Sequence, residues 1–548
     1  MNIKDQLKLR KYRGLLIFRG LFKKNPSISY LVDVMDEKQR ITFLILVASW
    51  GFSQLVFWYW WFNGEHIVNV TRFVFNTVIL AWSLLLPAYF FFFVSRMKRP
   101  NASLPFPKYR VAMVVTKAPS EPFSVVRKTL RAALSQTLPH DTWLADEGPT
   151  EETLNWCRQN GVFVSSRKGI QAYHQSTWPR RTRCKEGNLA YFYDTYGYDK
   201  YDVVAQLDAD HRPDPGYLAE MVRPFADPKV GYVSAPSICD ANSSLSWTSR
   251  ARLYAESTMH GALQAGYNSG WAPLCIGSHY AVRTTALKKI GGIGPELAED
   301  HSTTFLMQAH GFTGVHAFDA IAHGDGPLSF SDCMTQEFQW SRSLTVLLLT
   351  LTPKYLKVLP MRLKFQFLFS QLWYPAFGVM ILTSYAMIPL ALLTRQSWIN
   401  VSYFEFLFYS SLVMVTTLLI VVWVKSNGWL RPHNAKVFSW EVILFQLVRW
   451  PWLLLGSFFA IIDIYKKRPF EFKVTPKGTN VQSDLPVKPL LPYLAVIALL
   501  SLSAVWVPNA GAAKGYYFFA LLTSFTYVVV VFAIIIRHIY EKRNLNKI

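Results

Sequence analysis

Six runs of apolar residues, each long enough to cross a lipid bilayer, constrain the fold of this chain more than any other feature. A spanning helix takes roughly 20 apolar residues. The aromatic fraction of 16%, with 19 Trp, supports a membrane location, because Trp and Tyr favour the water–lipid boundary. We therefore expect membrane helices at about 41–62, 68–95, 365–394, 402–424, 487–508 and 515–537.

Positive charge flanks these runs. The net charge is +22, and the basic residues before the first run and after the last one predict cytoplasmic termini by the positive-inside rule. Membrane lipids are thus an expected partner. Nucleic acid is not, because the sequence contains no zinc finger, basic helix or RNA-binding pattern. The flanking residues are Lys8, Arg10, Lys11, Arg13, Lys23, Lys24, Arg537, Lys542 and Arg543.

A seventh apolar run, about 440–465, differs from the other six. It contains Glu441, Arg449 and Asp463, with Pro451 at its middle. Charges inside a spanning helix are costly, so we expect an amphipathic helix that lies at the membrane interface. Six crossings also return both termini to the same side. The alternative is a true seventh span.

Residues 100–345 have an ordinary soluble composition, in which β-rich apolar segments alternate with helical ones. This alternation is typical of a mostly parallel α/β sheet. All five cysteines fall in this region without metal-ligand spacing, which favours reduced thiols in the cytoplasm. The expected division is a basic cytoplasmic N-terminus (1–40), two membrane helices (41–99), the cytoplasmic domain (100–345), an interface helix with two membrane helices (346–439), the amphipathic helix and a loop (440–486), and two membrane helices with a basic C-terminus (487–548).

Carboxylates follow predicted strands of this domain. Asp208 and Asp210 come directly after the buried segment Val203–Leu207, and Asp146 follows a short strand at 143–145. Ligands of such sheets bind beyond the carboxyl ends of strands. Asp208 and Asp210 could present oxygens to Mg²⁺ or Mn²⁺ and so reach a diphosphate, and Asp146 could bind a base or ribose. A solvated turn explains either motif when it is taken alone.

Three further segments carry polar groups suited to sugar transfer. Glu299 and Asp300 follow a Gly-rich stretch and could include a general base for a sugar hydroxyl, although an acidic helix start explains them too. Gln336 and Trp340 suit a sugar subsite, in which the indole stacks on the ring and the amide holds hydroxyls; the alternative is an interfacial aromatic. The segment Phe472–Gly478 could contact a diphosphate or be a solvated loop.

Taken together, these motifs resemble the processive membrane-bound family 2 glycosyltransferases, which include cellulose, chitin and hyaluronan synthases. The family order D, D-x-D, [TA]-E-D, Q-x-x-R-W is matched by Asp146, Asp208 with Asp210, Glu299–Asp300, and Gln336 to Trp340. Phe472–Lys477 is similar to the gating-loop motif of cellulose synthases. The resemblance spans about residues 100–480.

The resemblance implies an α/β cytoplasmic glycosyltransferase domain of the GT-A type, inserted in an α-helical transmembrane domain of the inner or plasma membrane. The implied reaction is inverting transfer from a UDP-sugar, UDP-glucose being favoured, to a growing β-linked polysaccharide that leaves between the helices. Accessory export subunits or a second copy of the chain are further candidate partners.

The resemblance also implies a role for each matching residue. Asp300 would be the catalytic base with Glu299 as its neighbour, and Asp210 would bind the Mg²⁺ or Mn²⁺ cofactor. Trp340 and Gln336 would bind the acceptor. The nucleotide-binding residues would be Asp146, Lys185 (in the family's K-x-G-N segment), Asp208, Thr475 and Lys477.

Three positions depart from the family pattern. Gln339 replaces the Arg of Q-x-x-R-W, which normally contacts the departing diphosphate, and Arg342 is the nearest substitute. Glu147 stands where an Asp is common, and Ser120 precedes Glu121–Pro122 where the family has Asn. Two rival functions stay open: a non-processive enzyme with a lipid acceptor, and a catalytically silent relative that acts as a receptor or assembly protein.

Overall fold

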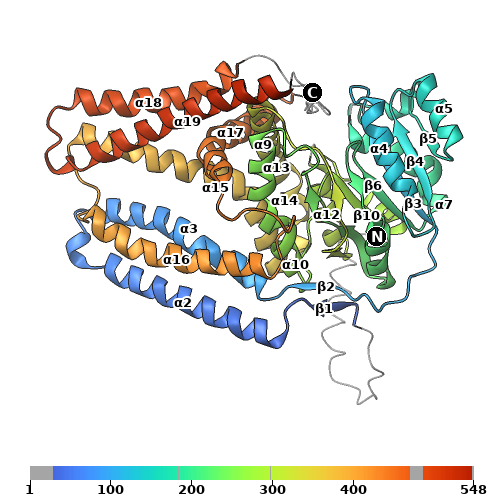
Figure 1. Ribbon diagram of the computed structural model, residues 1–548, viewed down its shortest axis with the longest axis horizontal. Coiled ribbons are helices and arrows are strands. Elements are labelled where there is room, and N and C mark those ends of the chain that lie inside the picture. Colours follow the sequence, from blue (N-terminus) through green and yellow to red (C-terminus); the bar gives the residue numbers. More distant parts are fainter. Residues whose placement is uncertain (1–28, 183, 296–297, 469–484, 546–548) are drawn as a thin grey trace.

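The computed structural model describes residues 29–182, 184–295, 298–468 and 485–545. Most of the predicted basic N-terminus and the whole segment Phe472–Gly478, with Thr475 and Lys477, therefore lie outside the described residues. Figure 1 shows two parts: long helices on one side and an α/β domain on the other.

A seven-stranded sheet forms the centre of the α/β domain, in the order β11-β8-β10-β6-β3-β4-β5. Neighbouring strands are parallel except β10, which is antiparallel to both β6 and β8. The predicted, mostly parallel sheet is confirmed. The strands are β3 (Val111–Lys117), β4 (Asp141–Asp146), β5 (Phe163–Ser165), β6 (Val203–Leu207), β8 (Val230–Ser234), β10 (His279–Arg283) and β11 (Thr313–His316).

Burial on both faces explains why the central strands are continuous apolar runs. Every residue of β3 and β6 is buried, as expected for strands covered by helices on both sides. The surrounding helices are α4 (Phe123–Leu134), α5 (Glu151–Gln159), α6 (Lys185–Phe192), α8 (Tyr217–Val222), α11 (Thr284–Ile290) and α12 (Glu299–Ala309). A small sheet of β7 (Arg212–Pro213), β12 (Ala322–His323) and β9 (Ser237–Ile238) lies beside them.

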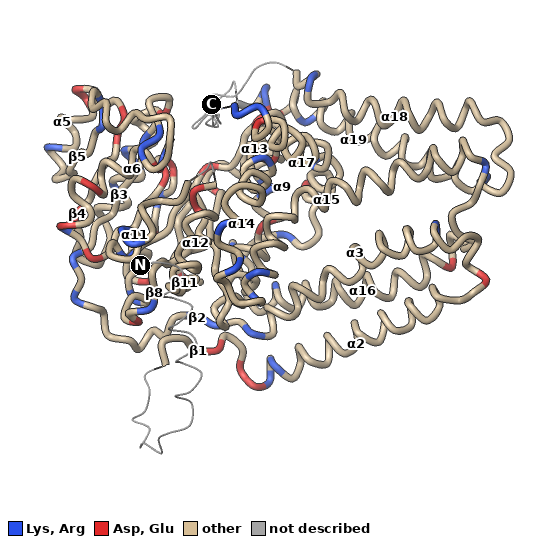
Figure 2. The backbone as a smooth tube through the Cα atoms, turned by 180° about the vertical axis from the view of Figure 1, so that it is seen from behind, with Lys and Arg blue, Asp and Glu red and all other residues tan. Residues whose placement is uncertain are grey.

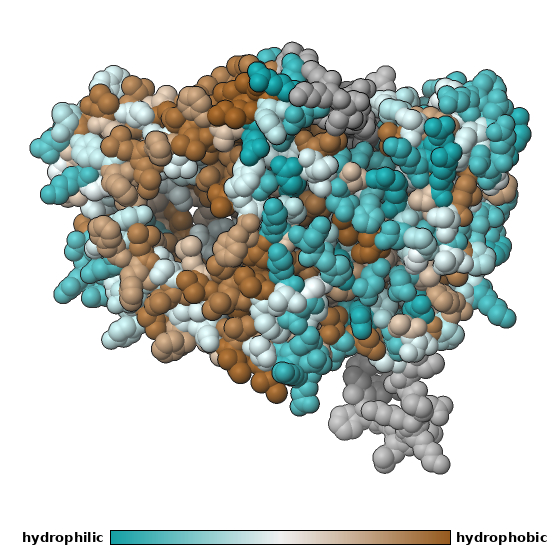
Figure 3. Space-filling model, viewed as in Figure 1, coloured by the Kyte–Doolittle hydropathy of each residue, from teal (hydrophilic) through white to brown (hydrophobic). Residues whose placement is uncertain are grey.

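Among the described residues, seven helices are long and apolar enough to cross a membrane. Their exposed surface is largely apolar, whereas polar side chains cover the α/β domain (Figure 3), and Lys, Arg, Asp and Glu are sparse along their middles (Figure 2). Lipid is the solvent that suits such a surface. The helices are α2 (Glu37–Trp61), α3 (Val70–Val94), α15 (Met361–Thr394), α16 (Tyr403–Ser426), α17 (Trp440–Tyr465), α18 (Val487–Trp506) and α19 (Tyr516–Leu545).

The connections at the end of the helices away from the α/β domain lie together. Asn400 Nδ2, before α16, donates to the Glu65 carbonyl between α2 and α3 at 3.0 Å. Arg72 Nη1 donates to the carbonyl of Ser397 at 3.2 Å. At the other end, Gln39 at the start of α2 bonds Asn427 after α16 at 2.8 Å. These contacts join α2 to α16 at both ends, and join α3 to the segment before α16 at the end away from the α/β domain.

Both ends of α17 are joined to helices of the α/β side. These are α9 (Trp247–Ala255) and α13 (Phe330–Thr350). Near its start, Glu441 pairs with Arg250 of α9 at 3.0 Å, and near its end, Asp463 pairs with Arg342 of α13 at 2.6 Å. The length and composition of α17 are those of a span, and half of its most apolar window is buried in protein. The interface position of α17 stays a prediction.

Close packing of α13 on α17 depends on a glycine. A Cβ at Gly456 would lie 2.4 Å from the Phe338 carbonyl oxygen. Ser341 Oγ of α13 donates to the Leu453 carbonyl at 2.6 Å and contacts Ser457 Oγ at 2.9 Å. The expected domain boundary at residue 345 falls inside α13, because this helix runs unbroken from the loop after β12 to the membrane helices.

Candidate active site

The carboxyl ends of parallel strands β3, β4 and β6 meet at one edge of the sheet, as expected for a ligand site. Asp146 is the last residue of β4 and is fully buried. Lys117 Nζ, at the end of β3, lies 3.1 Å from Asp146 Oδ1, and the Gly148 N–H donates to the same oxygen at 2.9 Å. A buried carboxylate needs such partners. Asp146 is therefore held rigidly at the sheet edge.

Lys185, the first residue of α6, joins the D-x-D motif to the carboxylates of α12. Its Nζ donates to Asp208 Oδ1 at 2.6 Å and to the Gly277 carbonyl, and lies 3.6 Å from Glu299 Oε1. Burial lowers the pKa of Lys185, but the charges of Asp208 and Glu299 outweigh it and raise the pKa above its usual value. A stable cation thus stands between two acidic motifs that are far apart in the sequence.

Glu299 and Asp300 form the first turn of α12 and are packed against Gly277. A Cβ at Gly277 would lie 3.4 Å from Asp300 Oδ2 and 3.7 Å from Glu299 Oε1. Burial is the largest cause that raises the pKa of both carboxyl groups, and their proximity adds to it for Glu299. The His301 N–H donates to Asp300 Oδ1 at 2.7 Å. A carboxyl group with a raised pKa is suited to accept a proton near neutral pH.

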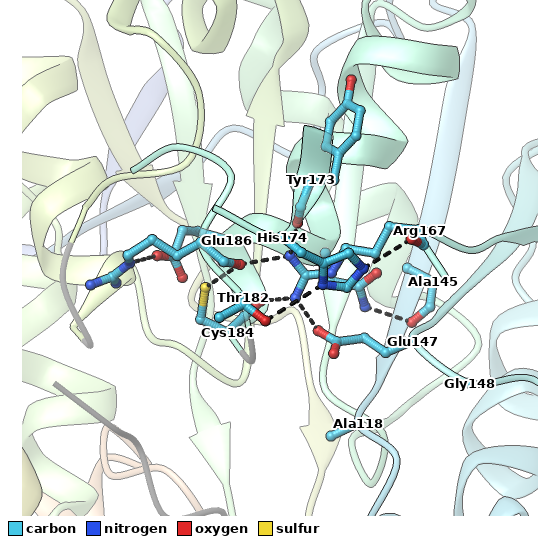
Figure 4. A network of polar contacts seen from close by, with 12 residues as sticks. Ala118, Ala145, Glu147, Gly148, Arg167, Tyr173, His174, Thr182, Cys184 and Glu186 are labelled. Carbon is cyan, nitrogen blue, oxygen red and sulfur yellow. Dashed lines mark hydrogen bonds and ion pairs between the residues drawn. The ribbon is translucent and has the colours of Figure 1, made fainter. Parts of the chain in front are cut away.

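A fully buried arginine, Arg167, organises the segment between β5 and α6 (Figure 4). Its guanidinium donates to the carbonyls of Tyr173 at 2.9 Å and Cys184 at 3.2 Å, and it pairs with Glu147. A Cβ at Gly187 would lie 2.3 Å from Arg167 Nη1. Gly187 of the K-x-G-N segment therefore makes room for Arg167. Glu147, which stands where the family commonly has Asp, is the ion-pair partner of Arg167.

Asp210 lies where β6 meets the small sheet, and it is buried. Its Oδ2 accepts from the Asp325 N–H at 3.0 Å, and its Oδ1 lies 3.4 Å from His211 Nδ1. No group of three His, Cys, Asp or Glu suited to a metal occurs among the described residues. Hard carboxylate oxygens from Asp208 and Asp210 fit Mg²⁺ or Mn²⁺ if a ligand supplies the other oxygens, as nucleotide phosphates commonly do.

Gln336 and Trp340 both lie on α13, one helical turn apart, and share a partner on α9. Arg252 stacks on Trp340 with 4.0 Å between the guanidinium carbon and the ring centroid, and its Nη1 donates to Gln336 Oε1. Gln339 is buried on the same helix. Arg342, the proposed substitute for the family Arg, is engaged by Asp463 of α17.

The structure thus brings together Lys185, Asp208, Glu299 and Asp300, and places Asp146 two strands from β6 on the same edge. Gln336 and Trp340 form a second group with Arg252. Sequence reasoning missed Lys117, Arg167 and Arg252. Lys117 ends β3 and Arg167 follows β5, so both could have been found by that position, whereas Arg252 carries no sequence signal.

Comparison with known proteins agrees with the motifs. A family model described as glycosyl transferase family group 2 matches residues 203–536, more than half of the chain. The cellulose synthase catalytic subunit [UDP-forming] of Xanthomonas axonopodis pv. citri is 26% identical over 234 residues, covering 41% of this chain and 30% of that protein. Cellulose synthase 2 of Novacetimonas hansenii is 24% identical over 396 residues, covering 70% of this chain and 23% of that protein. The matches thus cover less than a third of these relatives' own length.

Two solved structures are similar at low identity. The mannosyltransferase PcManGT from Pyrobaculum calidifontis, in complex with GDP-Man and Mn²⁺, is 14% identical with a TM-score of 0.36, over 82% of this chain and 97% of that chain. Glucosyl-3-phosphoglycerate synthase from Mycobacterium tuberculosis, with Mn²⁺, UDP-glucose and phosphoglyceric acid, is 15% identical with a TM-score of 0.29, over 43% of this chain and 79% of that chain.

Proposed function

The chain belongs to glycosyl transferase family group 2, and from that premise we propose that it is a processive, inverting polysaccharide synthase of the membrane. It transfers sugar from a UDP-sugar, with UDP-glucose favoured, to a growing β-linked glycan and passes the product across the bilayer. The observation that carries this proposal is the contact of Lys185 with both Asp208 and Glu299. That contact joins the proposed donor-binding motif to Glu299, the neighbour of the candidate base Asp300.

In this proposal each charged group of the cluster has one task. Lys185 stabilises negative charge that develops on the leaving nucleoside diphosphate, and Asp146 binds the nucleoside. Asp300 takes the proton of the acceptor hydroxyl while that oxygen attacks the anomeric carbon from the face opposite the diphosphate. The C–O bond to the diphosphate breaks as the new bond forms, which inverts the anomeric centre. Glu299 is the neighbour of Asp300 and lies beside the Lys185 ammonium group.

Asp208 and Asp210 would hold a divalent cation, Mg²⁺ or Mn²⁺. The chemistry that such an ion supplies is charge neutralisation on the diphosphate. Asp208 is about a third exposed, with a side-chain exposure of 32%, so its oxygens are accessible to a ligand. The buried Asp210 is oriented by the Asp325 N–H.

The membrane part supports a path for the acceptor. Trp340 and Gln336 lie on α13, which packs on α17 and is followed by α15, so an acceptor stacked on Trp340 lies close to the membrane helices. We propose six crossings, with α17 at the interface and with the α/β domain and both termini in the cytoplasm of a cell membrane. The ion pairs at both ends of α17 support this orientation.

The first experiment uses the protein in lipid nanodiscs with Mg²⁺ or Mn²⁺ and each common radiolabelled UDP-sugar in turn. Release of UDP together with a high-molecular-weight product is expected from one donor, and glycosidase digestion then identifies the linkage. UDP release with a labelled lipid and no polymer would instead establish a non-processive enzyme. A stable protein that turns over no donor in the full panel would contradict the proposal.

A further inference from the structure

The acceptor side of the site contains a buried cation that belongs to none of the sequence motifs. Arg252 lies in the last turn of α9, and its side chain is 14% exposed. It contacts Trp340 through the face of the indole ring and Gln336 through a hydrogen bond. One side chain from a different helix therefore touches both residues of the proposed acceptor subsite.

Arg252 is held in place from its other side. Its Nε donates to Glu256 Oε1 at 3.3 Å, and Glu256 Oε2 lies 3.4 Å from His260 Nε2. Burial acts to raise the pKa of Glu256, but Arg252 and His260 outweigh it and lower the pKa to about 2. Glu256 is therefore ionised at neutral pH and fixes the orientation of the Arg252 guanidinium.

The same line of contacts continues to the D-x-D motif. The Ser237 N–H donates to His260 Nδ1 at 3.4 Å, and Ser237 Oγ lies 3.4 Å from His211 Nε2. His211 Nδ1 is in turn 3.4 Å from Asp210 Oδ1. A series of polar contacts thus runs from the proposed metal ligand Asp210 to Arg252.

We propose that Arg252 is the positioning residue of the acceptor site. It covers one face of Trp340 and fixes Gln336, so that the opposite face of the indole is presented to the acceptor sugar. A guanidinium can stack on a ring and donate hydrogen bonds in its own plane at the same time, which an ammonium group cannot do. This inference rests on the proposed function and deepens it.

The test separates transfer from hydrolysis in nanodiscs, with the donor identified as above. Arg252→Gln should lower transfer by about 10- to 100-fold, because a misplaced acceptor loses the productive geometry. Hydrolysis of the donor and the KM for the donor should stay unchanged. Arg252→Lys keeps the charge without planar stacking and should rescue transfer only in part. In the Trp340→Ala background, Arg252→Gln should cause no further loss of transfer.

Arg223→Gln is the matched control. Arg223 also stacks on an aromatic ring, with 4.3 Å to the centroid of Phe106, and has a side-chain exposure of 11%. Arg223→Gln should lower the thermal stability of the protein without changing the ratio of transfer to hydrolysis. Three results would overturn the inference: wild-type transfer by Arg252→Gln, additive losses with Trp340→Ala, or a parallel fall of transfer and hydrolysis with a raised donor KM. The last would assign Arg252 to the leaving diphosphate.

Acceptor binding without any donor provides a readout independent of turnover. A soluble β-linked glucan oligosaccharide should bind the wild-type protein at least about tenfold more tightly than either Arg252→Gln or Trp340→Ala. Equal binding by the wild type and Arg252→Gln would overturn the inference. If oligosaccharide binding depends on Arg252 while no donor is turned over, the result supports the acceptor site and contradicts the proposed reaction.

Discussion

The residues proposed to react are adjacent to groups of opposite charge that lie far away in the sequence. Lys185 lies between Asp208 and Glu299, and the Asp300 carboxyl is buried beside them. Each burial would be unfavourable alone, since an unpaired charge in a protein interior costs several kcal/mol. Grouping the charges offsets that cost and leaves a carboxyl group whose proton affinity is raised.

Asp300→Asn should lower sugar transfer by about 10²- to 10⁴-fold, the usual contribution of a general base. UDP and Mn²⁺ binding, measured by calorimetry in nanodiscs, should be nearly unchanged, because the amide keeps the shape of the side chain. Glu152→Gln, an exposed acidic residue in the first turn of α5, is the control and should keep full transfer. Lost UDP binding in Asp300→Asn would show that the base is elsewhere.

The acidic limb of the pH dependence of kcat/KM should be unchanged in Glu299→Gln. In the proposed mechanism Asp300 is active when deprotonated, and burial raises its pKa, so activity falls as the pH drops through that raised pKa. Burial and the charge of Asp300 raise the pKa of Glu299 to about 8, so Glu299 is already protonated in that pH range. Replacing it with an uncharged amide should therefore leave the acidic limb in place, whatever the plateau rate. An acidic limb that moves to lower pH would show that Glu299 is charged while Asp300 titrates.

Among the secondary-structure elements, α6 positions two residues at the proposed donor site. Asn188 Nδ2 donates to the Ala145 carbonyl at the end of β4 at 2.9 Å, and Lys185 starts the helix. Gly187 allows the helix to approach the buried Arg167 and the Arg181 carbonyl. Three residues of the K-x-G-N segment thus have a structural role. Lys185 supplies charge, Gly187 allows close approach, and Asn188 makes a hydrogen bond.

Gly187→Ala should disturb this arrangement. Its Cβ would lie 2.0 Å from the Arg181 carbonyl oxygen, and such overpacking costs about 1–3 kcal/mol of stability. The displaced helix should carry Lys185 away and weaken UDP-sugar binding, measured by calorimetry beside a thermal melt. Gly216→Ala, where a Cβ meets nothing within 4 Å, should change neither. Unaltered UDP-sugar binding by Gly187→Ala would show that α6 does not set the donor site.

At the scale of the whole molecule, the spanning helices form two groups, with α2, α3 and α16 in one and α15, α18 and α19 in the other (Figure 1). Large apolar side chains point outward from them, among them Tyr59 at 89% and Trp506 at 81% exposure. Such a surface is suited to contact with lipid. The helix α17 differs, because its charged residues pair with α9 and α13.

Cysteine labelling can determine the number of crossings. In intact cells, an impermeant maleimide should label Glu65→Cys, which lies between α2 and α3, from outside. Lys436→Cys, before α17, and Leu485→Cys, before α18, replace exposed residues and should both be labelled only after permeabilisation. Labelling of Lys436→Cys and Leu485→Cys from opposite sides would make α17 a seventh span and refute six crossings.

The class of the fold could be predicted from the sequence alone, whereas the predicted boundary at residue 345 falls inside α13. Apolar length predicts the spanning helices, strand–helix alternation predicts the sheet, and Val203–Leu207 was predicted with the bounds that β6 has. These features can be predicted because they depend on the spacing of apolar residues along a short stretch of the chain. The family motifs also predict that Asp146, Lys185, Asp208 and Asp300 belong to one site.

The partners of these residues become visible only in the folded protein. Lys117 for Asp146, Arg167 for Glu147, Arg252 for Trp340 and Asp463 for Arg342 are pairs between separate elements. No spacing rule connects residues such as Arg342 and Asp463, because their approach depends on the close packing of α13 and α17 at Gly456. Buried charges need a partner because burial removes them from water. Which residue becomes that partner depends on how the elements pack, so a local sequence pattern does not predict it.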